Sequence, residues 1–277
     1  MRIFLTGGTG FIGSYVMIKA LAYGHEVIAL RRSSLSRPVI PVNQEPTWLN
    51  CDLVDLTPDL LRGCDVVIHL ASSGVSPKQA TWNELIDVNA LGPAHLIATA
   101  HEAGVSRFIV AGTCHEYGAS ANHYRAIPVT APLVPLTQYG ASKAAGFHLL
   151  CGYARCHHLS LYYGRIFNAF GEGQYCGNFW PSLRDAAIAG TDFPMTMGKQ
   201  IRDFVPVESV AEILLNASTI AELIPGIPCI KNIGTGRSSS LLDFARNEWQ
   251  KFNASGIILP GMLPERPDEI QRLVPDI

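Results

Sequence analysis

TGGTGFIG, at residues 6–13, follows the short apolar run MRIFL at residues 1–5. Its glycines allow a tight turn, let the backbone approach a phosphate closely and let the following helix pack against the preceding strand. A glycine triplet alone is weak evidence, but a strand is predicted before this one, a helix after it and a second strand at residues 26–30. The stretch therefore predicts the phosphate-binding turn of a dinucleotide-binding βαβ unit, with a ligand-free βα turn as the alternative. The residues predicted to lie against the pyrophosphate are Gly7, Gly10, Phe11, Ile12 and Gly13.

The end of the second predicted strand indicates which dinucleotide binds. About 20 residues past the glycines, an NAD site usually places Asp or Glu to accept hydrogen bonds from the adenosine ribose. This chain has Arg31 and Arg32 there, followed by Ser33. Guanidinium groups bind phosphate oxygens in pairs and cannot accept a hydrogen bond from a ribose hydroxyl. The sequence therefore predicts NADP(H) rather than NAD(H), although a solvated basic loop tip is the alternative role for these arginines.

Composition argues against several classes of protein. The 277 residues are 48% hydrophobic and 16% charged, which is enough apolar content for a substantial core. A net charge of −2 gives no electrostatic footprint for nucleic acid or an anionic membrane. The seven cysteines are an odd number without paired CxxC spacing, so we expect reduced thiols and no metal site. No apolar run approaches the roughly 20 residues of a membrane span, and the chain enters a strand without a leader, so a cytoplasmic protein acting on small molecules is expected.

Short apolar runs alternate with helical patterns along the first 166 residues. The runs lie at residues 3–5, 26–30, 65–70, 107–111 and 160–166. This βαβ rhythm predicts an α/β fold with a doubly wound, Rossmann-type parallel sheet that binds its ligand beyond the carboxyl ends of the strands. Gly and Pro become frequent after residue 168, which predicts a smaller C-terminal substrate-binding lobe. We expect an NADP-binding domain at residues 1–167 with a returning segment at about 201–236, and the lobe at residues 168–200 and 237–277.

Three residues form a candidate catalytic group. Tyr139 and Lys143 stand four apart, a spacing that places both side chains on one face of a helix. An ammonium near a phenol lowers the phenol's pKa from about 10, and such a phenol can exchange a proton with a carbonyl or alcohol oxygen. Thr113, at the end of a predicted strand, is placed to hydrogen-bond the same oxygen. A Tyr-x-x-x-Lys pair alone occurs by chance on many helices, but with the glycine turn and Thr113 it predicts a hydride-transfer site.

Together these motifs make the chain resemble the extended short-chain dehydrogenase/reductase superfamily, in particular its NAD(P)-dependent sugar-nucleotide epimerases, dehydratases and 4-ketoreductases. The resemblance covers almost the entire chain. It implies that CDL at residues 51–53 lies beside the adenine, that HLAS at residues 69–72 lines the dinucleotide, and that Asn89 supports the active site. The cofactor-binding residues implied in this way are Asp52, Leu53, Leu70, Ala71, Ser72, Asn89 and Ile166, together with Tyr139 and Lys143.

The same resemblance implies a nucleotide-sugar site. It assigns Asn168 and Asn178 to the nucleotide diphosphate, and it matches Arg202 and Arg266 to a pyrophosphate clamp. Arginine forks suit a diphosphate because they bind it in a bidentate manner, and Glu269 lies where an acidic residue can accept from the ribose. Each arginine taken alone would be an ordinary solvated charge. Together they favour a nucleotide-sugar substrate.

The loop after Thr113 bears on the type of reaction. Dehydratases of the superfamily carry an acidic residue or pair there, whereas this chain has Cys114 and His115, so dehydration is disfavoured. Glu116 falls at a position that the superfamily usually fills with an apolar residue. A net reductase exchanges NADPH in every turnover whereas an epimerase need not release its cofactor, so Arg31 and Arg32 favour reduction.

The loop also resembles that of CDP-abequose synthase-like deoxysugar reductases. We therefore expect an oxidoreductase that uses NADPH to reduce a nucleotide-linked 4-keto-6-deoxy sugar in deoxysugar biosynthesis. The alternatives are an NAD(P)-dependent sugar-nucleotide epimerase, a reductase of another small carbonyl compound, and a dinucleotide-binding regulator without catalysis. The nucleotide base, the sugar and the stereochemistry of the product are left open.

Members of the superfamily often dimerise through the helix that carries the Tyr-x-x-x-Lys pair, so a homodimer is expected. Such a contact would bury Leu91, Leu96, Phe147 and Leu150 between subunits, while an ordinary core position is the alternative for each. The chain also stops where members usually continue into a further helical segment, which predicts an abbreviated lobe or one completed by a partner.

Overall fold

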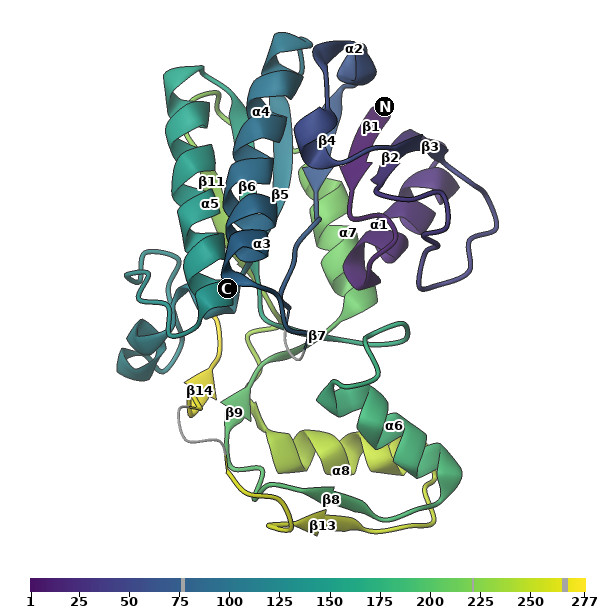
Figure 1. Cartoon of the computed structure of the whole chain (residues 1–277). Helices are drawn as coiled ribbons and strands as arrows, with labels where there is room; N and C mark the ends of the chain where they lie inside the picture. The colour runs from purple at the N-terminus through teal and green to yellow at the C-terminus, as the bar shows by residue number, and fades with distance from the viewer. Residues whose placement is uncertain (76–77, 221, 266–268) are drawn as a thin grey trace.

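A seven-stranded parallel sheet forms the centre of the protein (Figure 1). The computed structural model describes residues 1–75, 78–220, 222–265 and 269–277. The strand order is β11-β6-β5-β4-β1-β2-β3. The doubly wound Rossmann-type fold predicted from the sequence is confirmed, with β3 and β11 present in addition to the five predicted strands. These strands are β1 (Arg2–Thr6), β2 (Glu26–Arg31), β3 (Thr47–Asn50), β4 (Val66–His69), β5 (Arg107–Thr113), β6 (Ser160–Ile166) and β11 (Cys229–Ile233).

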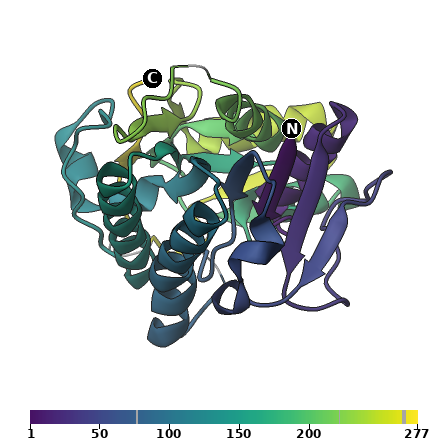
Figure 2. The same cartoon turned by 90° about the horizontal axis from the view of Figure 1, so that it is seen from above.

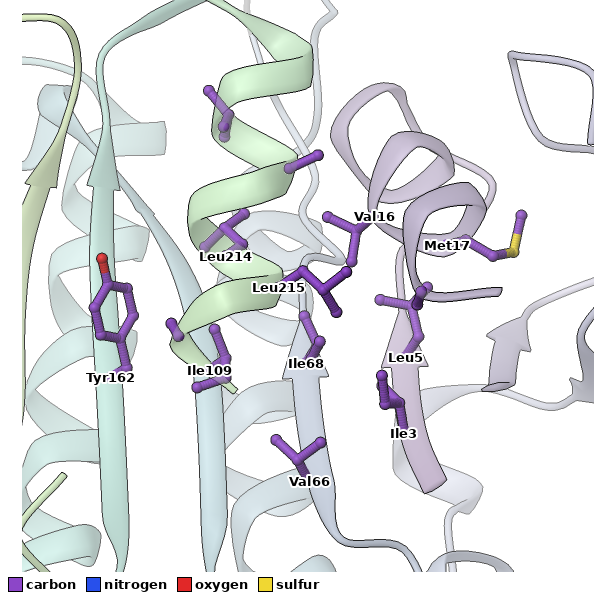
Figure 3. Close-up of a cluster of buried hydrophobic side chains, with 14 of the residues drawn as sticks. Ile3, Leu5, Val16, Met17, Val66, Ile68, Ile109, Tyr162, Leu214 and Leu215 are labelled. Carbon is purple, nitrogen blue, oxygen red and sulfur yellow. The ribbon is translucent and has the colours of Figure 1, made fainter. Parts of the chain in front are cut away.

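Helices cover both faces of this sheet, as the view from above shows (Figure 2). In β1, alternate side chains point to opposite faces: Ile3 and Leu5 pack beneath one layer of helices and Phe4 packs beneath the other. Figure 3 shows Ile3 and Leu5 converging with Val16 and Leu215 from the first layer. That layer contains α1 (Phe11–Ala22) and α7 (Val207–Ala217). The opposite face carries α2 (Pro58–Leu61), α4 (Gly92–Glu102) and α5 (Gln138–Cys156). Directly before α4 in the chain come α3 (Trp82–Ile86) and the π-helical turn η2 (Asp87–Leu91).

The strand order reverses between β1 and β4, which is the place where doubly wound folds bind their ligands, beyond the carboxyl ends of the strands. Thr6, the last residue of β1, joins the two strands at this point. Its hydroxyl oxygen accepts hydrogen bonds from the backbone N–H groups of Leu70 and Ala71 at 3.3 and 3.2 Å, and it bonds His69 Nδ1 at 2.8 Å. This edge of the sheet is therefore rigid where a dinucleotide would lie.

A smaller lobe lies below the sheet in Figure 1. Leu183, Phe193, Met195 and Trp249 form its separate hydrophobic cluster. Its elements are α6 (Phe179–Ala189), β8 (Phe193–Met195), α8 (Leu241–Lys251) and β13 (Ile258–Pro260). Short strands connect it to the sheet: β7 (Asn168–Phe170) pairs with β10 (Phe204–Pro206), and β9 (Ile201–Arg202) pairs with β12 (Ser239–Ser240) and β14 (Arg272–Leu273).

The end of the chain differs from the predicted lobe boundary. Residues 237–277 were assigned to the lobe as one span, but Leu273 and Val274 are buried against the sheet domain. Ile127 N–H donates to the carbonyl of Val274, and Leu273 packs with Tyr117 and Phe167. The end of the chain thus returns from the lobe to the sheet domain. Burial of its apolar side chains beside the loop after β5 accounts for this. That loop contains the 3-10 turns η3 (Cys114–Glu116) and η4 (Ala119–His123); η1 (Leu53–Asp55) follows β3.

The four apolar positions considered for a subunit contact separate into two kinds. Leu96, Phe147 and Leu150 are buried in the core beneath α4 and α5, which favours the ordinary core position for these three. Leu91 is 53% exposed and stays available for a contact. Among the described residues, none of the helices has both the length and the apolar content needed to cross a membrane.

Candidate active site

The glycine turn has the close backbone packing that its sequence predicts. Gly7 has φ +75°, and a Cβ added there would lie 2.7 Å from the backbone nitrogen of Ala71. A Cβ at Gly13 would lie 2.0 Å from the Gly7 carbonyl oxygen, so α1 can approach the turn only through a glycine. Gly10 is the N-cap of α1 and has no side chain to occupy the N–H groups of Phe11, Ile12 and Gly13. These N–H groups at a helix N-terminus fit a pyrophosphate.

The two arginines at the end of β2 have different surroundings. Arg31 Nε donates to Asn50 Oδ1 at 2.8 Å, and its guanidinium lies 4.7 Å from the centre of the Trp48 ring, so it is braced against β3. Arg32 is exposed. Ser33 Oγ accepts the N–H of Leu35 at 3.1 Å, which turns the loop back. The predicted phosphate contact therefore falls mainly on Arg32, with Arg31 forming a wall of the same corner.

The other predicted cofactor residues also lie at the carboxyl ends of strands. Asp52 and Leu53 follow β3, beside the end of β2, where an adenine would lie. Leu70 and Ala71 follow β4, with Ala71 against the glycine turn. Ile166 ends β6 and is buried. The fold brings these residues together along one edge of the sheet, as expected for a doubly wound fold.

Thr113, Tyr139 and Lys143 meet at the end of β5. Thr113 is the last residue of that strand, and Thr137 caps the start of α5 by accepting the N–H of Gly140 at 3.0 Å. This cap places Tyr139 in the first turn of α5, half-buried, with its phenol near the hydroxyls of Ser72 and Thr113. Lys143 is buried one turn later. The three candidate catalytic residues thus form one cluster.

The electrostatics of this cluster differ from the expectation in one respect. Lys143 Nζ donates to the carbonyl of Ala111 at 2.8 Å, and burial lowers the pKa of this lysine. Burial also raises the pKa of Tyr139 to about 12, outweighing the hydrogen bonds from Ser72 and Thr113 that lower it. Lys143 is hydrogen-bonded to the Ala111 carbonyl in the protein alone, and its effect on the pKa of the Tyr139 phenol stays a prediction. The phenol is protonated at neutral pH and can act as an acid.

Asn89 connects the active-site helix to the loop after β4. Its Oδ1 accepts from the Ser72 hydroxyl at 3.0 Å and from the backbone N–H of Ser73 at 2.9 Å. Its Nδ2 donates to Ser142 Oγ, also at 3.0 Å, within α5. Asn89 lies in η2, and π-helical turns occur frequently at functional sites. It therefore holds Ser72 beside Tyr139, which gives a structural basis for its predicted supporting role.

Charged and polar side chains approach the same cluster from the lobe. Arg202 Nη2 donates to Glu269 Oε1 at 3.0 Å, so these two predicted substrate residues form a partly buried pair. The His115 ring lies edge-on to that of Tyr139, with centroids 6.0 Å apart. Burial, with a smaller effect from Arg202, lowers the pKa of His115 and keeps its imidazole neutral.

The remaining predicted substrate residues are placed less directly. Asn168 Nδ2 donates to the carbonyl of Asp203 at 3.0 Å and thereby supports the strand that carries Arg202. Asn178 is the half-buried N-cap of α6. Arg266 lies outside the described residues. Among the residues that are described, no group of three or more His, Cys, Asp or Glu side chains is placed to hold a metal ion.

One feature of the site was missed from the sequence. Glu116 and Arg165 form a buried ion pair at 2.7 Å directly beneath Thr113. Glu116 was set aside as a catalytic base because of its position in the motif, and its complete burial agrees with that. The sequence does contain a signal for the pair, because Arg165 is the one charged residue within the otherwise apolar run 160–166.

A family model supplies the identification. The model described as the NAD dependent epimerase/dehydratase family matches residues 3–226, which include the glycine turn, Thr113, Tyr139 and Lys143. The chain belongs to this family. As an epimerase/dehydratase family member, the protein is an enzyme, and the extended short-chain dehydrogenase resemblance is confirmed.

Relatives of this family member carry out several reactions. It is 27% identical to a UDP-glucose 4-epimerase of Erwinia amylovora over 89% of this chain and 81% of that protein. It is also 27% identical to UDP-glucuronic acid decarboxylase 1 of Xenopus tropicalis over the whole of this chain, which spans 66% of that protein's length.

Two solved structures resemble this family member over nearly its full length. MoeE5 in complex with UDP-glucuronic acid and NAD matches with a TM-score of 0.84 and 26% identity, covering 100% of this chain and 90% of MoeE5. TunA, an NAD-dependent NDP-hexosamine 5,6-dehydratase, matches with a TM-score of 0.83 and 27% identity, covering 99% of this chain and 88% of TunA.

Proposed function

We propose that the protein reduces a nucleotide-linked 4-keto-6-deoxy sugar with NADPH. The observation that carries the proposal is the corner after β2, where Arg31 and Arg32 stand and the usual ribose-binding carboxylate is absent from these positions. A corner of this kind favours the 2′-phosphate of NADP(H) over NAD(H). A cofactor that is exchanged in each turnover suits a net reductase.

The candidate site supports this chemistry at the proton-transfer step. Tyr139, protonated at neutral pH, donates its proton to the oxygen of the ketone as that oxygen gains charge. Thr113 donates a hydrogen bond to the same oxygen and stabilises the developing charge. Lys143 orients the ribose beside the nicotinamide. When bound, the dinucleotide supplies the hydride that reaches the keto carbon.

A nucleotide-sugar substrate is supported by the lobe and by the relatives. Arg202 projects a buried guanidinium into the site, and a diphosphate would replace part of its pairing with Glu269. MoeE5 and the UDP-glucose 4-epimerases act on or bind sugar nucleotides, as their names state. We also propose that the protein is a homodimer in the cytoplasm.

Epimerisation is the second candidate, and a specific observation favours it. The relatives that match along most of this chain include UDP-glucose 4-epimerases, and the matching MoeE5 structure contains NAD. An epimerase needs the same Thr113, Tyr139 and Lys143 group. The two candidates differ in whether the nicotinamide is consumed.

NADPH consumption separates them. The purified protein is mixed with NADPH and with CDP-, dTDP- or GDP-linked 4-keto-6-deoxy sugars, and the loss of NADPH absorbance is followed. Tyr139→Phe is the control, because it keeps the ring in place and removes the acid. Consumption with one sugar nucleotide that disappears in Tyr139→Phe is the expected result. No consumption with any of them, together with interconversion of UDP-glucose and UDP-galactose, would reject the reductase in favour of the epimerase.

A further inference from the structure

Glu116 and Arg165 lie at the centre of a polar network beneath the candidate catalytic residues. Their side chains are 0% and 2% exposed, and Arg165 Nε lies 2.7 Å from Glu116 Oε2. No step of the proposed reaction uses either residue. Removing either partner alone would leave a buried charge unpaired, whereas the intact pair adds little net stability over apolar packing. The role of this ion pair therefore lies in the groups that it holds in position.

Glu116 holds the backbone of Thr113. The N–H of Thr113 donates to Glu116 Oε1 at 2.9 Å, and the same oxygen accepts the hydroxyl of Tyr163 at 2.8 Å. The other carboxylate oxygen is occupied by Arg165. The carboxylate is thus fixed by three donors from the two strands β5 and β6, and its position fixes the end of β5 in return.

Arg165 is itself held from several sides. Its guanidinium lies 4.4 Å from the centre of the Phe147 ring and 4.9 Å from that of Tyr117. Its Nη1 donates to the Tyr117 hydroxyl and to the carbonyl of Val129, each at 3.2 Å. Gly112 makes room for the network, since a Cβ there would lie 2.2 Å from the Tyr163 ring and 2.8 Å from Glu116 Oε1.

The network also sets the direction of the Thr113 hydroxyl. Thr113 Oγ1 accepts the N–H of His115, while the Glu116 carboxylate accepts the N–H of Thr113, so the turn is closed by two reciprocal hydrogen bonds. A hydroxyl carries one proton and two acceptor sites. Because one acceptor site is occupied by His115, the Thr113 proton is confined to the remaining directions, which include the side of Tyr139.

We propose that Glu116, paired with Arg165, is a positioning residue that holds Thr113 so that its hydroxyl donates toward the reacting oxygen. The proposal rests on the proposed function in assigning Thr113 to that oxygen. It predicts that the charge on Glu116 affects the catalytic step far more than the binding of substrate or cofactor, because Glu116 touches neither.

Glu116→Gln tests this, with Glu248→Gln as the matched control. Glu248 is also a buried carboxylate that accepts a hydrogen bond, from Trp180 Nε1 at 2.9 Å, but it lies within the lobe. The two variants are compared by kcat and KM for the sugar nucleotide and by the affinity for NADPH. The Thr113 amide is followed by NMR in a protein whose threonines alone carry an isotopic label. Its resonance is identified as the one that disappears in Thr113→Ser.

We expect Glu116→Gln to lower kcat by about 10- to 100-fold, because a catalytic group misplaced by up to about 1 Å loses about that much in rate. The KM and the affinity for NADPH are expected to stay within about twofold of wild type. The Thr113 amide proton moves upfield because its acceptor loses its charge. Glu248→Gln leaves kcat and the Thr113 amide unchanged. If Glu116→Gln does not fold, Arg165→Lys is measured in its place. That variant keeps the charge on Glu116 but removes the guanidinium that holds its carboxylate, so a fall in kcat with KM unchanged and a displaced Thr113 amide resonance are expected.

An unshifted Thr113 amide, or equal effects of Glu116→Gln on kcat and KM, would overturn the positioning role. Failure of the proposed function is seen separately, because it appears in the wild-type protein as an absence of NADPH consumption. In that case kcat is measured for epimerisation with the same variants, and the amide resonance still decides whether Glu116 holds Thr113.

Discussion

Two glycines of α5 predict opposite outcomes for the same substitution. A Cβ at Gly146 would lie 2.2 Å from the carbonyl oxygen of Asn89, whereas a Cβ at Gly152 would meet nothing within 4 Å. Alanine is favoured over glycine within a helix by about 0.5–1 kcal/mol. Gly152→Ala is therefore expected to raise the free energy of unfolding by about that amount.

Gly146→Ala gains the same helix propensity but must separate α5 from η2. Ordinary Cβ contacts begin at 3.4 Å, so the two segments would have to part by 3.4 minus 2.2, or about 1.2 Å. Overpacking of this kind costs about 1–3 kcal/mol. The same displacement strains the bond from Asn89 to Ser142 and the loop that holds Ser72 beside Tyr139. A misplacement of about 1 Å can lower a rate by about 100-fold.

Urea denaturation and steady-state kinetics on both variants test this reasoning. Gly146→Ala is expected to unfold at lower urea than wild type and to lose about 10- to 100-fold in kcat/KM. Gly152→Ala is expected to be at least as stable as wild type and fully active, and gel filtration checks that both keep the same oligomeric state. Equal stability and activity in the two variants would refute the assignment of the Asn89 contact as a positioning element.

Three further predictions follow from the cofactor edge of the sheet. Gly7→Ala and Gly24→Ala both place alanine at positive φ, at a strain of about 1–2 kcal/mol each. Only the methyl group at Gly7 also meets backbone, 2.7 Å from the nitrogen of Ala71, so Gly7→Ala should be the less stable variant and should distort the dinucleotide turn, and calorimetry should find cofactor binding lost in that variant alone. Arg32→Ala should weaken NADP⁺ about tenfold or more and leave NAD⁺ nearly unchanged, and equal losses for both dinucleotides would contradict the phosphate contact. Burial lowers the pKa of His69 from 6.5 to about 3. Between these two values the unfolded chain takes up a proton that the folded chain does not. The free energy of unfolding should therefore fall as the pH drops below 6.5, by up to about 1.4 kcal/mol per pH unit. His69→Gln should reduce that slope between pH 6.5 and about 5 in denaturation curves, and an unchanged slope would show that His69 is not buried in its neutral form.

The parts of the fold that the sequence predicts are those encoded by residue type at short range. The glycine turn is predictable because the positive φ of Gly7 and the close approach at Gly13 exclude other residues. The five predicted strands are short apolar runs buried on both faces. β3 escapes this pattern because it is a half-exposed edge strand with Thr47 and Asn50 at its ends, and β11 escapes it because Lys231 and Asn232 interrupt its apolar pattern.

The parts of the site that the sequence does not predict depend on contacts between distant residues. Tyr139 and Lys143 were placed on one helix face, but the raised pKa of Tyr139 depends on how deeply the fold buries it. Glu116 and Arg165 are 49 residues apart, and only the pairing of β5 with β6 brings them together. The return of Leu273 to the sheet domain is a pairing of two-residue strands, which carries no periodic signal.

Transfer of deuterium from labelled NADPH to the sugar tests the central claim most directly. The protein is incubated with NADPH that carries deuterium at the transferable position of the nicotinamide and with the sugar nucleotide that supports NADPH consumption, and the product is analysed by mass spectrometry. The account predicts a reduced sugar that carries the deuterium, in an amount equal to the NADPH oxidised, and no labelled product with Tyr139→Phe. An interconverted sugar with NADPH unconsumed would contradict the account and identify the protein as an epimerase. NADPH oxidation without deuterium in the sugar would contradict hydride transfer to the keto carbon.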